Sequence, residues 1–414
     1  MEEESPVVLT SRLAGYLVSS ALADALIPIF SIFLPLFAAT LGANPLELGL
    51  VGGASYAVYS FMPFVMGHFS DRSGSRKFFI IIAFALLSVV SLLYSISNDP
   101  VTLITVRIFE GIGWSMLWPA MDAAVTEDTT RDSRSSLAIY NYLWSGGSAL
   151  GPLFGTFLVT MYSYRSAFFA TGILFAFLIL LNGVTFWRER NPAPNTNSAK
   201  SAQRLRSTTP DVHSIFHTGG RNRSIEVWTA LTTMGLVTLT TLTFFTFFGP
   251  YATSIGMTVV LIGAVTTAFG VVRFFMFVAL ANKSLRERVF DIRNRIRNLV
   301  AFACIASLSS LLLIVKDSTG VAYFFSFAIF GIGYSVVYAV SQATLIAETA
   351  PEQRGAAAGL FESSLGIGGV IGPIVAGAVS SKSLTTAFVV PPASLVFVLI
   401  FLCISFFLWR ESRS

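Results

Sequence analysis

The pentapeptide Gly111-Ile112-Gly113-Trp114-Ser115 is nearly repeated as Gly331-Ile332-Gly333-Tyr334-Ser335, 220 residues later. Downstream of both copies lies the pattern Gly-x-x-x-Gly-Pro, at 147–152 and again at 368–373, an offset of 221. Two similar halves in a strongly apolar chain indicate an internally repeated membrane protein. Among membrane proteins this architecture is typical of secondary transporters.

The composition argues against a soluble protein. Apolar residues make up 54% of the 414 residues, charged residues only 12%, and the mean hydropathy is +0.72, whereas soluble domains carry about 25% charged residues. Runs of about 20 apolar residues can cross a bilayer as helices. Twelve such runs predict an all-α integral membrane protein with two six-helix halves. The predicted spans are 12–37, 47–69, 78–95, 101–126, 136–160, 166–187, 227–250, 259–281, 298–315, 319–346, 356–380 and 385–409.

The longest polar stretch, 188–226, separates the sixth predicted span from the seventh. It predicts a cytoplasmic linker between a first half, 1–187, and a second half, 227–414. His213 and His217 within it have i, i+4 spacing. Two histidines alone make a poor metal site, so we expect neither a metal nor a cofactor.

The Lys and Arg residues predict the orientation in the membrane. If both termini are cytoplasmic, Arg165, Lys316 and Lys382 lie outside, Arg107 and Arg273 lie within helices, and the remaining 22 of 27 lie inside. We therefore expect a multi-pass protein of the cytoplasmic membrane with both ends in the cytoplasm. This bias also accounts for the basic loops, which therefore do not indicate nucleic-acid binding.

The loop after the second predicted span reads Gly67-His68-Phe69-Ser70-Asp71-Arg72-Ser73-Gly74-Ser75-Arg76-Lys77. It resembles the signature loop of the major facilitator superfamily, although Ser75 stands where that family usually has a basic residue. Asp71 at a helix end can accept hydrogen bonds from the other half and act as a latch; the alternative is a basic loop that only fixes topology. The second half has Leu285 in place of this aspartate, so we expect a one-sided latch. The residues predicted for this cytoplasmic gating loop are Gly67, Asp71, Arg72, Gly74, Arg76 and Lys77.

Two further motifs extend the resemblance over almost all of the chain outside the linker. The segment 107–113 resembles the family's Arg-x-x-Gln-Gly-x-Gly motif, with Glu110 in place of the Gln. The pattern Gly-x-x-x-Gly-Pro-x-x-Gly at 147–155 is similar to a motif of the proton-coupled drug antiporters of this superfamily, with Thr156 where a second Gly is common. The resemblance implies the major facilitator fold, alternating access and a role for Arg107 in proton transfer.

The Gly-Pro motifs also have a mechanical interpretation. Small residues four positions apart let helices pack closely, and a proline permits a bend. The motifs therefore predict either paired hinges or close packing seams without a gating role. Their residues are Gly147, Gly151, Pro152 and Gly155 in the first half, and Gly368, Gly372 and Pro373 in the second.

Charged residues at membrane depth are costly and are therefore functional candidates. Asp24 lies near the middle of the first predicted span, with no Lys or Arg within one helical turn. We expect its carboxyl group to exchange protons, the alternative being a protonated group that serves packing alone. Arg107 and Glu110 are three residues apart and can pair on one helix face, either for proton coupling or as a static ion pair.

The remaining membrane charges are assigned from their surroundings. Glu362 aligns with Asn141 across the repeat, so both are predicted to face a cavity and contact substrate or protons. Arg273 lies in a Phe-rich segment and is predicted to reach the inner face, to pair with Glu362 or another acid, or to lie over aromatic rings. Asp122 is near the cytoplasmic end of its span, which favours a surface role. Aromatic candidates for a cavity lining, most of which packing alone can also explain, are Trp114, Trp118, Tyr140, Trp144, Tyr334, Tyr338 and Phe361.

These observations predict a secondary active transporter that exports small amphipathic compounds in exchange for protons. We expect it to be a monomer in the lipid bilayer, with coupling concentrated in the first and fourth spans. Alternatives are proton-linked uptake of a sugar, organic acid or nucleoside, and a non-transporting receptor. An enzyme is disfavoured because no nucleophile–base pair or metal cluster is evident, and an ATP-driven pump because the sequence has no Gly-x-x-x-x-Gly-Lys-Ser/Thr loop.

Overall fold

The structure is a computed structural model that describes residues 11–73, 75–126, 133–187, 221–291, 294–347, 349 and 354–411. Within these ranges all regular elements are helices, and each predicted span falls on one helix or on helical elements joined end to end. The elements of the first half are α1 (Ser11–Pro28), η1 (Ile29–Phe33), α2 (Leu34–Thr40), α3 (Pro45–Tyr59), α4 (Met62–Ser73), α5 (Arg76–Ile96), α6 (Pro100–Thr126), α7 (Ser133–Met161) and α8 (Tyr164–Trp187). Those of the second half are α11 (Arg221–Ser254), α12 (Val259–Ala281), α13 (Lys283–Phe290), α14 (Arg295–Leu308), η2 (Ser309–Ile314), α15 (Val321–Gln342), η3 (Ala343–Ala347), α16 (Arg354–Val379), η5 (Leu384–Val389) and α17 (Val390–Glu411).

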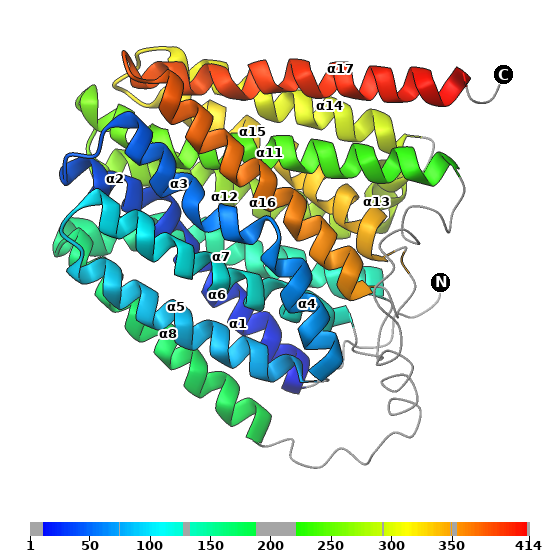
Figure 1. Cartoon of the computed structure of the whole chain (residues 1–414), viewed down its shortest axis with the longest axis horizontal. Helices are drawn as coiled ribbons and strands as arrows, with labels where there is room; N and C mark the ends of the chain where they lie inside the picture. Colours follow the sequence, from blue (N-terminus) through cyan, green and yellow to red (C-terminus); the bar gives the residue numbers. More distant parts are fainter. Residues whose placement is uncertain are drawn as a thin grey trace.

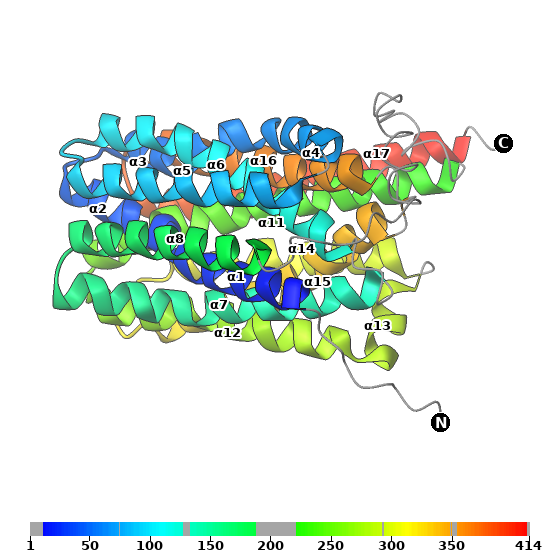
Figure 2. The ribbon, with the colours of Figure 1, turned by 90° about the horizontal axis from the view of Figure 1, so that it is seen from below.

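The helices run side by side as one bundle, with the start of α1 and the end of α17 at the same end (Figure 2). We call this the proximal end and the opposite one the distal end. Ten of the helical segments in the described ranges are long and apolar enough to cross a membrane. α6 and α7, with 27 and 29 residues, are also long enough to cross a bilayer. The seventh span differs from expectation: α11 begins at Arg221, inside the predicted linker, and the rest of the linker lies outside the described residues.

The two halves contact each other mainly through two long helix pairs. α16 packs against α3 and α4, and α7 packs against α12. Figure 1 shows α16 alongside α3, and Figure 2 shows α7 next to α12. These four spans therefore frame the space between the halves.

Within each half, the Gly-Pro helix packs closely on the first helix of that half. A Cβ atom on Gly147 would collide with the backbone carbonyl of Ala21 in α1, and one on Gly368 would collide with the carbonyl of Gly235 in α11. The helix pairs α1–α7 and α11–α16 are repeat counterparts. The close packing predicted for these motifs is therefore present, and their use as hinges stays a prediction.

The first span is irregular beside the cavity described below. Pro28 has no amide hydrogen, so it cannot donate the helical hydrogen bond to the carbonyl of Asp24, four residues earlier. The π-helical turn η1 follows directly at Ile29–Phe33. Such turns often occur at functional sites. The irregularity gives the chain around Asp24 a different geometry from an ideal helix.

Candidate functional site

A cavity of about 160 Å³ lies between the two halves. Because one water molecule needs roughly 10–15 Å³, this volume holds several waters or part of a small organic molecule. The lining comes from α1, η1, α3, α6 and α7 on one side and from α11, α12, α15 and α16 on the other. It is mostly apolar and aromatic. Among the described lining residues the charged ones are two arginines and four carboxylates: Asp24, Arg107, Glu110, Asp122, Arg273 and Glu362.

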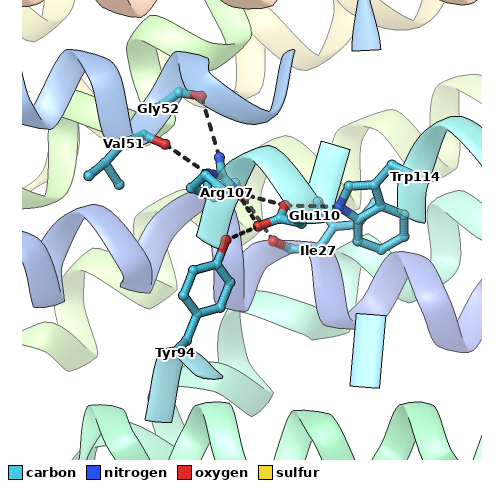
Figure 3. Close-up of polar contacts among 8 residues, drawn as sticks. Ile27, Val51, Gly52, Tyr94, Arg107, Glu110 and Trp114 are labelled. Atoms are coloured by element: carbon cyan, nitrogen blue, oxygen red, sulfur yellow. Dashed lines mark hydrogen bonds and ion pairs between the residues drawn. The ribbon is translucent and has the colours of Figure 1, made fainter. Parts of the chain in front are cut away.

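The first ion pair of the cavity lies entirely within the first half (Figure 3). Arg107 donates from one nitrogen to both carboxylate oxygens of Glu110, at 2.6 and 2.7 Å. Its Nε donates to the backbone carbonyl of Val51 at 2.7 Å, which anchors α6 to α3. The i, i+3 pairing predicted from the sequence is therefore present.

Glu110 in this pair accepts hydrogen bonds from two aromatic residues as well. The hydroxyl of Tyr94 on α5 donates to it at 2.5 Å, and Nε1 of Trp114 donates at 2.9 Å. Both carboxylate oxygens are thus hydrogen-bonded inside the protein (Figure 3). The hydrogen-bonding capacity of this buried carboxylate is therefore satisfied by donors of the protein itself. The arrangement ties α3, α5 and α6 together.

The second ion pair joins the two halves. Arg273 on α12 donates to Asp24 on α1 at 2.7 Å, and it also hydrogen-bonds the hydroxyl of Ser148 on α7. No basic residue lies within one turn of Asp24 on its own helix, and its partner comes from the other half, 249 residues away. Of the alternatives for Arg273, the structure combines two: it pairs with an acid, although not with Glu362, and it lies over aromatic rings.

The rings around Arg273 form an aromatic cage. Its guanidinium carbon lies 4.4 Å from the ring centroid of Trp144, 5.1 Å from that of Phe269 and 5.7 Å from that of Tyr334. Contacts of this kind stabilise a desolvated cation. The cage includes residues of both halves, so it also contributes to holding them together.

Two further polar contacts cross between the halves. Tyr59 on α3 donates to Glu362 on α16 at 2.6 Å. Asn141 on α7 donates to Gln342 on α15 at 2.7 Å, while Nε1 of Trp144 donates to Asn141 at 3.0 Å. Asn141 does not line the cavity itself, but it positions Trp144, which does. The other predicted proton or substrate candidates all line this one cavity.

Asp122 is where the sequence interpretation failed. It is only 2% exposed and lines the cavity, and the hydroxyl of Tyr140 hydrogen-bonds it. The predicted surface role was wrong because α7 and α16 cover this face of α6. The position of Asp122 near the end of its span gave no indication that two other helices bury it.

Aromatic side chains make up much of the remaining wall. The rings of Trp114 and Trp118 stack with centroids 5.9 Å apart, and Trp144 follows at 6.4 Å from Trp118. Of the seven aromatic residues predicted as cavity candidates, all but Phe361 line it. The sequence reasoning missed the polar partners Tyr59, Ser148 and Gln342 and the lining residue Tyr56, although each is a polar group within an apolar run.

The predicted gating loop is described only in part. Gly67 lies in α4, and Arg76 at the start of α5 donates to the hydroxyl of Ser70 at 2.9 Å. Gly74 and the side chains of Asp71 and Arg72 lie outside the described residues. The latch therefore stays a prediction from resemblance.

A helical bundle with an internal repeat and a central cavity between its halves defines the class of membrane transporters. The chain belongs to the Major Facilitator Superfamily, whose profile matches residues 14–345 and 288–414. This membership confirms the predicted fold class and superfamily, and it places the chain among transporters rather than enzymes.

Solved structures agree over the full length. The chain resembles the nucleoside transporter NupG, with a TM-score of 0.70 and 13% identity over 96% of this chain and 99% of that one. It also resembles a bacterial homolog of the human lysosomal transporter Spinster in an inward-facing, unoccupied conformation, with a TM-score of 0.66 and 16% identity over 97% and 96%. At these identities the likeness concerns the fold alone.

Sequence relatives have varied names. An uncharacterized MFS-type transporter of Methanocaldococcus jannaschii is 24% identical over 82% of this chain and 83% of its own length. The multi-drug resistance efflux pump PmrA of Streptococcus pneumoniae is 27% identical, but only over 30% of this chain and 31% of PmrA. The methyl viologen resistance protein SmvA of Salmonella typhimurium is 29% identical over 32% and 27%.

Proposed function

We propose that the protein exports small amphipathic compounds in exchange for protons by alternating access between two six-helix halves, 1–187 and 227–414. The observation that carries this proposal is the composition of the central cavity, in which four carboxylates face a wall of aromatic rings. Aromatic faces accommodate apolar and cationic molecules, and buried carboxylates are suitable sites for protons.

The contacts between the halves supply a coupling mechanism. Opening the cavity toward one side requires the polar contacts across it to separate, including Asp24–Arg273 and Tyr59–Glu362. A proton on Asp24 removes the negative charge that attracts Arg273, which favours separation. Proton binding and opening would then be linked through one residue pair.

The names of two sequence relatives support export. The names of PmrA and SmvA refer to multi-drug efflux and to resistance against methyl viologen, and both align with about a third of this chain. The Gly-Pro motif of α7 supports the same proposal. With both termini in the cytoplasm, as the basic residues predict, protons would enter the cell while the compound leaves.

Transport into inside-out membrane vesicles tests the proposal. With an acidic vesicle interior, we expect accumulation of a fluorescent amphipathic compound such as rhodamine 6G, abolished by a protonophore. The Asp24→Asn variant should lose this accumulation, whereas Asp99→Asn, an exposed carboxylate outside the cavity, serves as the matched control. Accumulation that is independent of the pH gradient, or no transport of any compound in an amphipathic panel, would contradict the proposal.

Proton-linked uptake of an anionic metabolite is the second candidate. The observation that favours it is the pair of arginines in the cavity lining, Arg107 and Arg273. A probable hexose phosphate transport protein of Chlamydia pneumoniae is 24% identical over 35% of this chain and 32% of its own length. Uptake of labelled sugar phosphates and organic acids by whole cells distinguishes the two candidates, with uncharged nucleosides as the comparison.

A further inference from the structure

The internal repeat relates two contacts between the halves. Asp122 aligns with Gln342 at an offset of 220, and Asn141 aligns with Glu362 at an offset of 221. Asn141 bonds Gln342 across the halves at 2.7 Å, so the repeat makes Asp122 and Glu362 the equivalent positions on the other side of the bundle. Where one side has two amides, the other has two carboxyl groups.

The carboxyl groups of Asp122 and Glu362 line the same cavity. Asp122 and Glu362 are 2% and 3% exposed, both line the cavity, and they lie within electrostatic reach of each other. Tyr140 hydrogen-bonds Asp122, and Tyr59 donates to Glu362 at 2.6 Å. Each carboxyl group therefore belongs to a different half and is oriented by a tyrosine of the first half.

The charges of the cavity lining are arranged in pairs. Arg107 is bonded to Glu110 at 2.6 Å, and Arg273 is bonded to Asp24 at 2.7 Å. These two pairs are each neutral. The other two carboxyl groups of the described lining are those of Asp122 and Glu362, and each is hydrogen-bonded by a tyrosine hydroxyl.

Two carboxyl groups that share a buried site do not both ionise readily, so such a pair retains at least one proton. A cation placed beside the pair can replace one proton while the net charge stays the same. Trp118 lies one helical turn from Asp122 on α6, and Trp144 lies one turn from Tyr140 on α7. Both indoles line the cavity and offer ring faces to a cation or to its apolar groups.

We propose that Asp122 and Glu362 form one site, contributed jointly by the two halves, that holds either protons or the charged group of an amphipathic organic cation, with one proton released for each positive charge bound. This site rests on the proposed function, since it specifies which amphipathic compounds the exporter takes and where they exchange with protons. Neutral and anionic compounds of the same shape lack the charge that the exchange requires.

The exchange predicts a definite pH dependence. If one proton leaves for each monovalent cation bound, the affinity rises about tenfold per pH unit while the site is protonated. The titratable groups within electrostatic reach of Glu362 are spread over four neighbouring helices: Tyr56 and Tyr59 on α3, Asp122 on α6, Tyr140 on α7, and Tyr334 and Tyr338 on α15.

Isothermal titration calorimetry of the purified full chain in detergent tests the site. The probes are tetraphenylphosphonium, a monovalent cation, and tetraphenylborate, an anion of nearly the same shape. Titrations in buffers of different ionisation enthalpy count the protons released. We expect one proton per tetraphenylphosphonium, about two per methyl viologen, which is a dication, and no binding of tetraphenylborate at this site. Cation binding without proton release would overturn the inference.

The internal repeat suggests a double variant that tests the site. Asp122→Gln combined with Glu362→Asn installs the amide pair of the other side of the bundle, which preserves hydrogen bonding and removes both charges. We expect affinity for tetraphenylphosphonium to fall by about 30-fold or more and proton release to disappear. The single variants Asp122→Asn and Glu362→Gln keep the side-chain shapes, so they test the site even if the double variant folds poorly. Thermal melting of each variant detects a folding defect. Asp317→Asn, which changes a half-buried carboxylate in a distal loop outside the cavity lining, is the control.

Flux measurements separate this inference from the proposed function. If the wild type binds the cation with proton release but a pH gradient drives no flux in proteoliposomes, the proposed function fails and the site stands. If gradient-driven flux is present but proton release persists in the double variant, the site fails and the proposed function stands.

Discussion

The two arginine–carboxylate pairs of the cavity have almost the same chemistry but different connections. Arg107–Glu110 and Asp24–Arg273 are both buried, with nitrogen–oxygen distances of 2.6 and 2.7 Å. The first pair lies on one helix and bonds only to elements of the first half. The second pair joins helices of opposite halves.

This difference sets what happens when a pair is broken. The bonds of Arg107 to Val51 and Glu110 lie within the first half and do not depend on how the halves dock, so loss of Glu110 leaves its charge uncompensated in every arrangement of the halves. Arg273 can be hydrated if the halves separate, because its partner belongs to the other half. The first pair is therefore expected to stabilise the fold and the second to control the balance between conformations.

The largest effect on stability is expected for Glu110→Gln. This change leaves Arg107 beside a neutral side chain in a buried position, which should lower the free energy of unfolding by about 3–5 kcal/mol. Reversible denaturation in detergent measures the loss. A decrease no larger than that of Asp24→Asn, measured in parallel, would show that the two pairs do not differ as described.

A conformational effect is expected for Asp24→Asn. With Arg273 released, the population should shift toward a state with the halves apart at one end. Spin labels at Ser73 and Ser284 report distances across the proximal end, and labels at Thr40 and Ser254 report distances across the distal end; all four positions are exposed. The Asp24→Glu variant, which keeps the charge, is the control. Unchanged distance distributions at both ends would refute this role for the pair.

Smaller losses of stability are expected when either of two glycines at helix contacts is replaced by alanine. Gly147→Ala places a methyl group against the carbonyl of Ala21 in the same half, whereas Gly270→Ala places one against the carbonyl of Ser148 in the other half. We expect Gly147→Ala to cost about 1–3 kcal/mol of stability, and Gly270→Ala to cost less because the halves can move apart. Denaturation measures the loss of stability, and the same label pairs measure any separation of the halves. Gly183→Ala is the control, because a Cβ atom there would meet open space.

The smallest effect is expected at the distal loop before α6. Asp99 accepts hydrogen bonds from the amide and hydroxyl of Thr102 at 2.8 and 2.6 Å, and these bonds lower the pKa of its carboxyl group. The stability that the ionised Asp99 carboxylate contributes is therefore fully present above its ordinary pKa of about 4. It is lost as the pH falls through the lower pKa of the folded protein. Asp99→Ala should slightly lower the melting temperature at neutral pH, and the difference from wild type should shrink at acid pH.

Comparison of these regions explains what the sequence could predict. The Arg107–Glu110 pair follows from a spacing of three residues on one helix, so local periodicity is sufficient. The partner of Asp24 lies 249 residues away and depends on how the halves dock. The repeat predicted equivalent positions but not which positions meet, so the contacts of Asn141 with Gln342 and of Tyr59 with Glu362 required the structure.

Apolar periodicity predicted the helices well because membrane spans have a simple length and composition. It predicted burial poorly where a charged residue lies near the end of a span, as Asp122 illustrates. The start of α11 was also placed too late, because the polar residues after Arg221 resemble a linker although they form the first turns of a helix.

The indole of Trp144 beneath the guanidinium of Arg273 also gives the protein an intrinsic optical probe. The emission spectrum of tryptophan depends on nearby charge, so movement of Arg273 away from this ring alters the fluorescence. The stacked rings of Trp114 and Trp118 lie on one helix, and their spacing does not depend on how the halves dock. The chain thus combines a chromophore that responds to docking with a neighbouring pair that serves as an internal reference, and its motions can be followed without an attached dye.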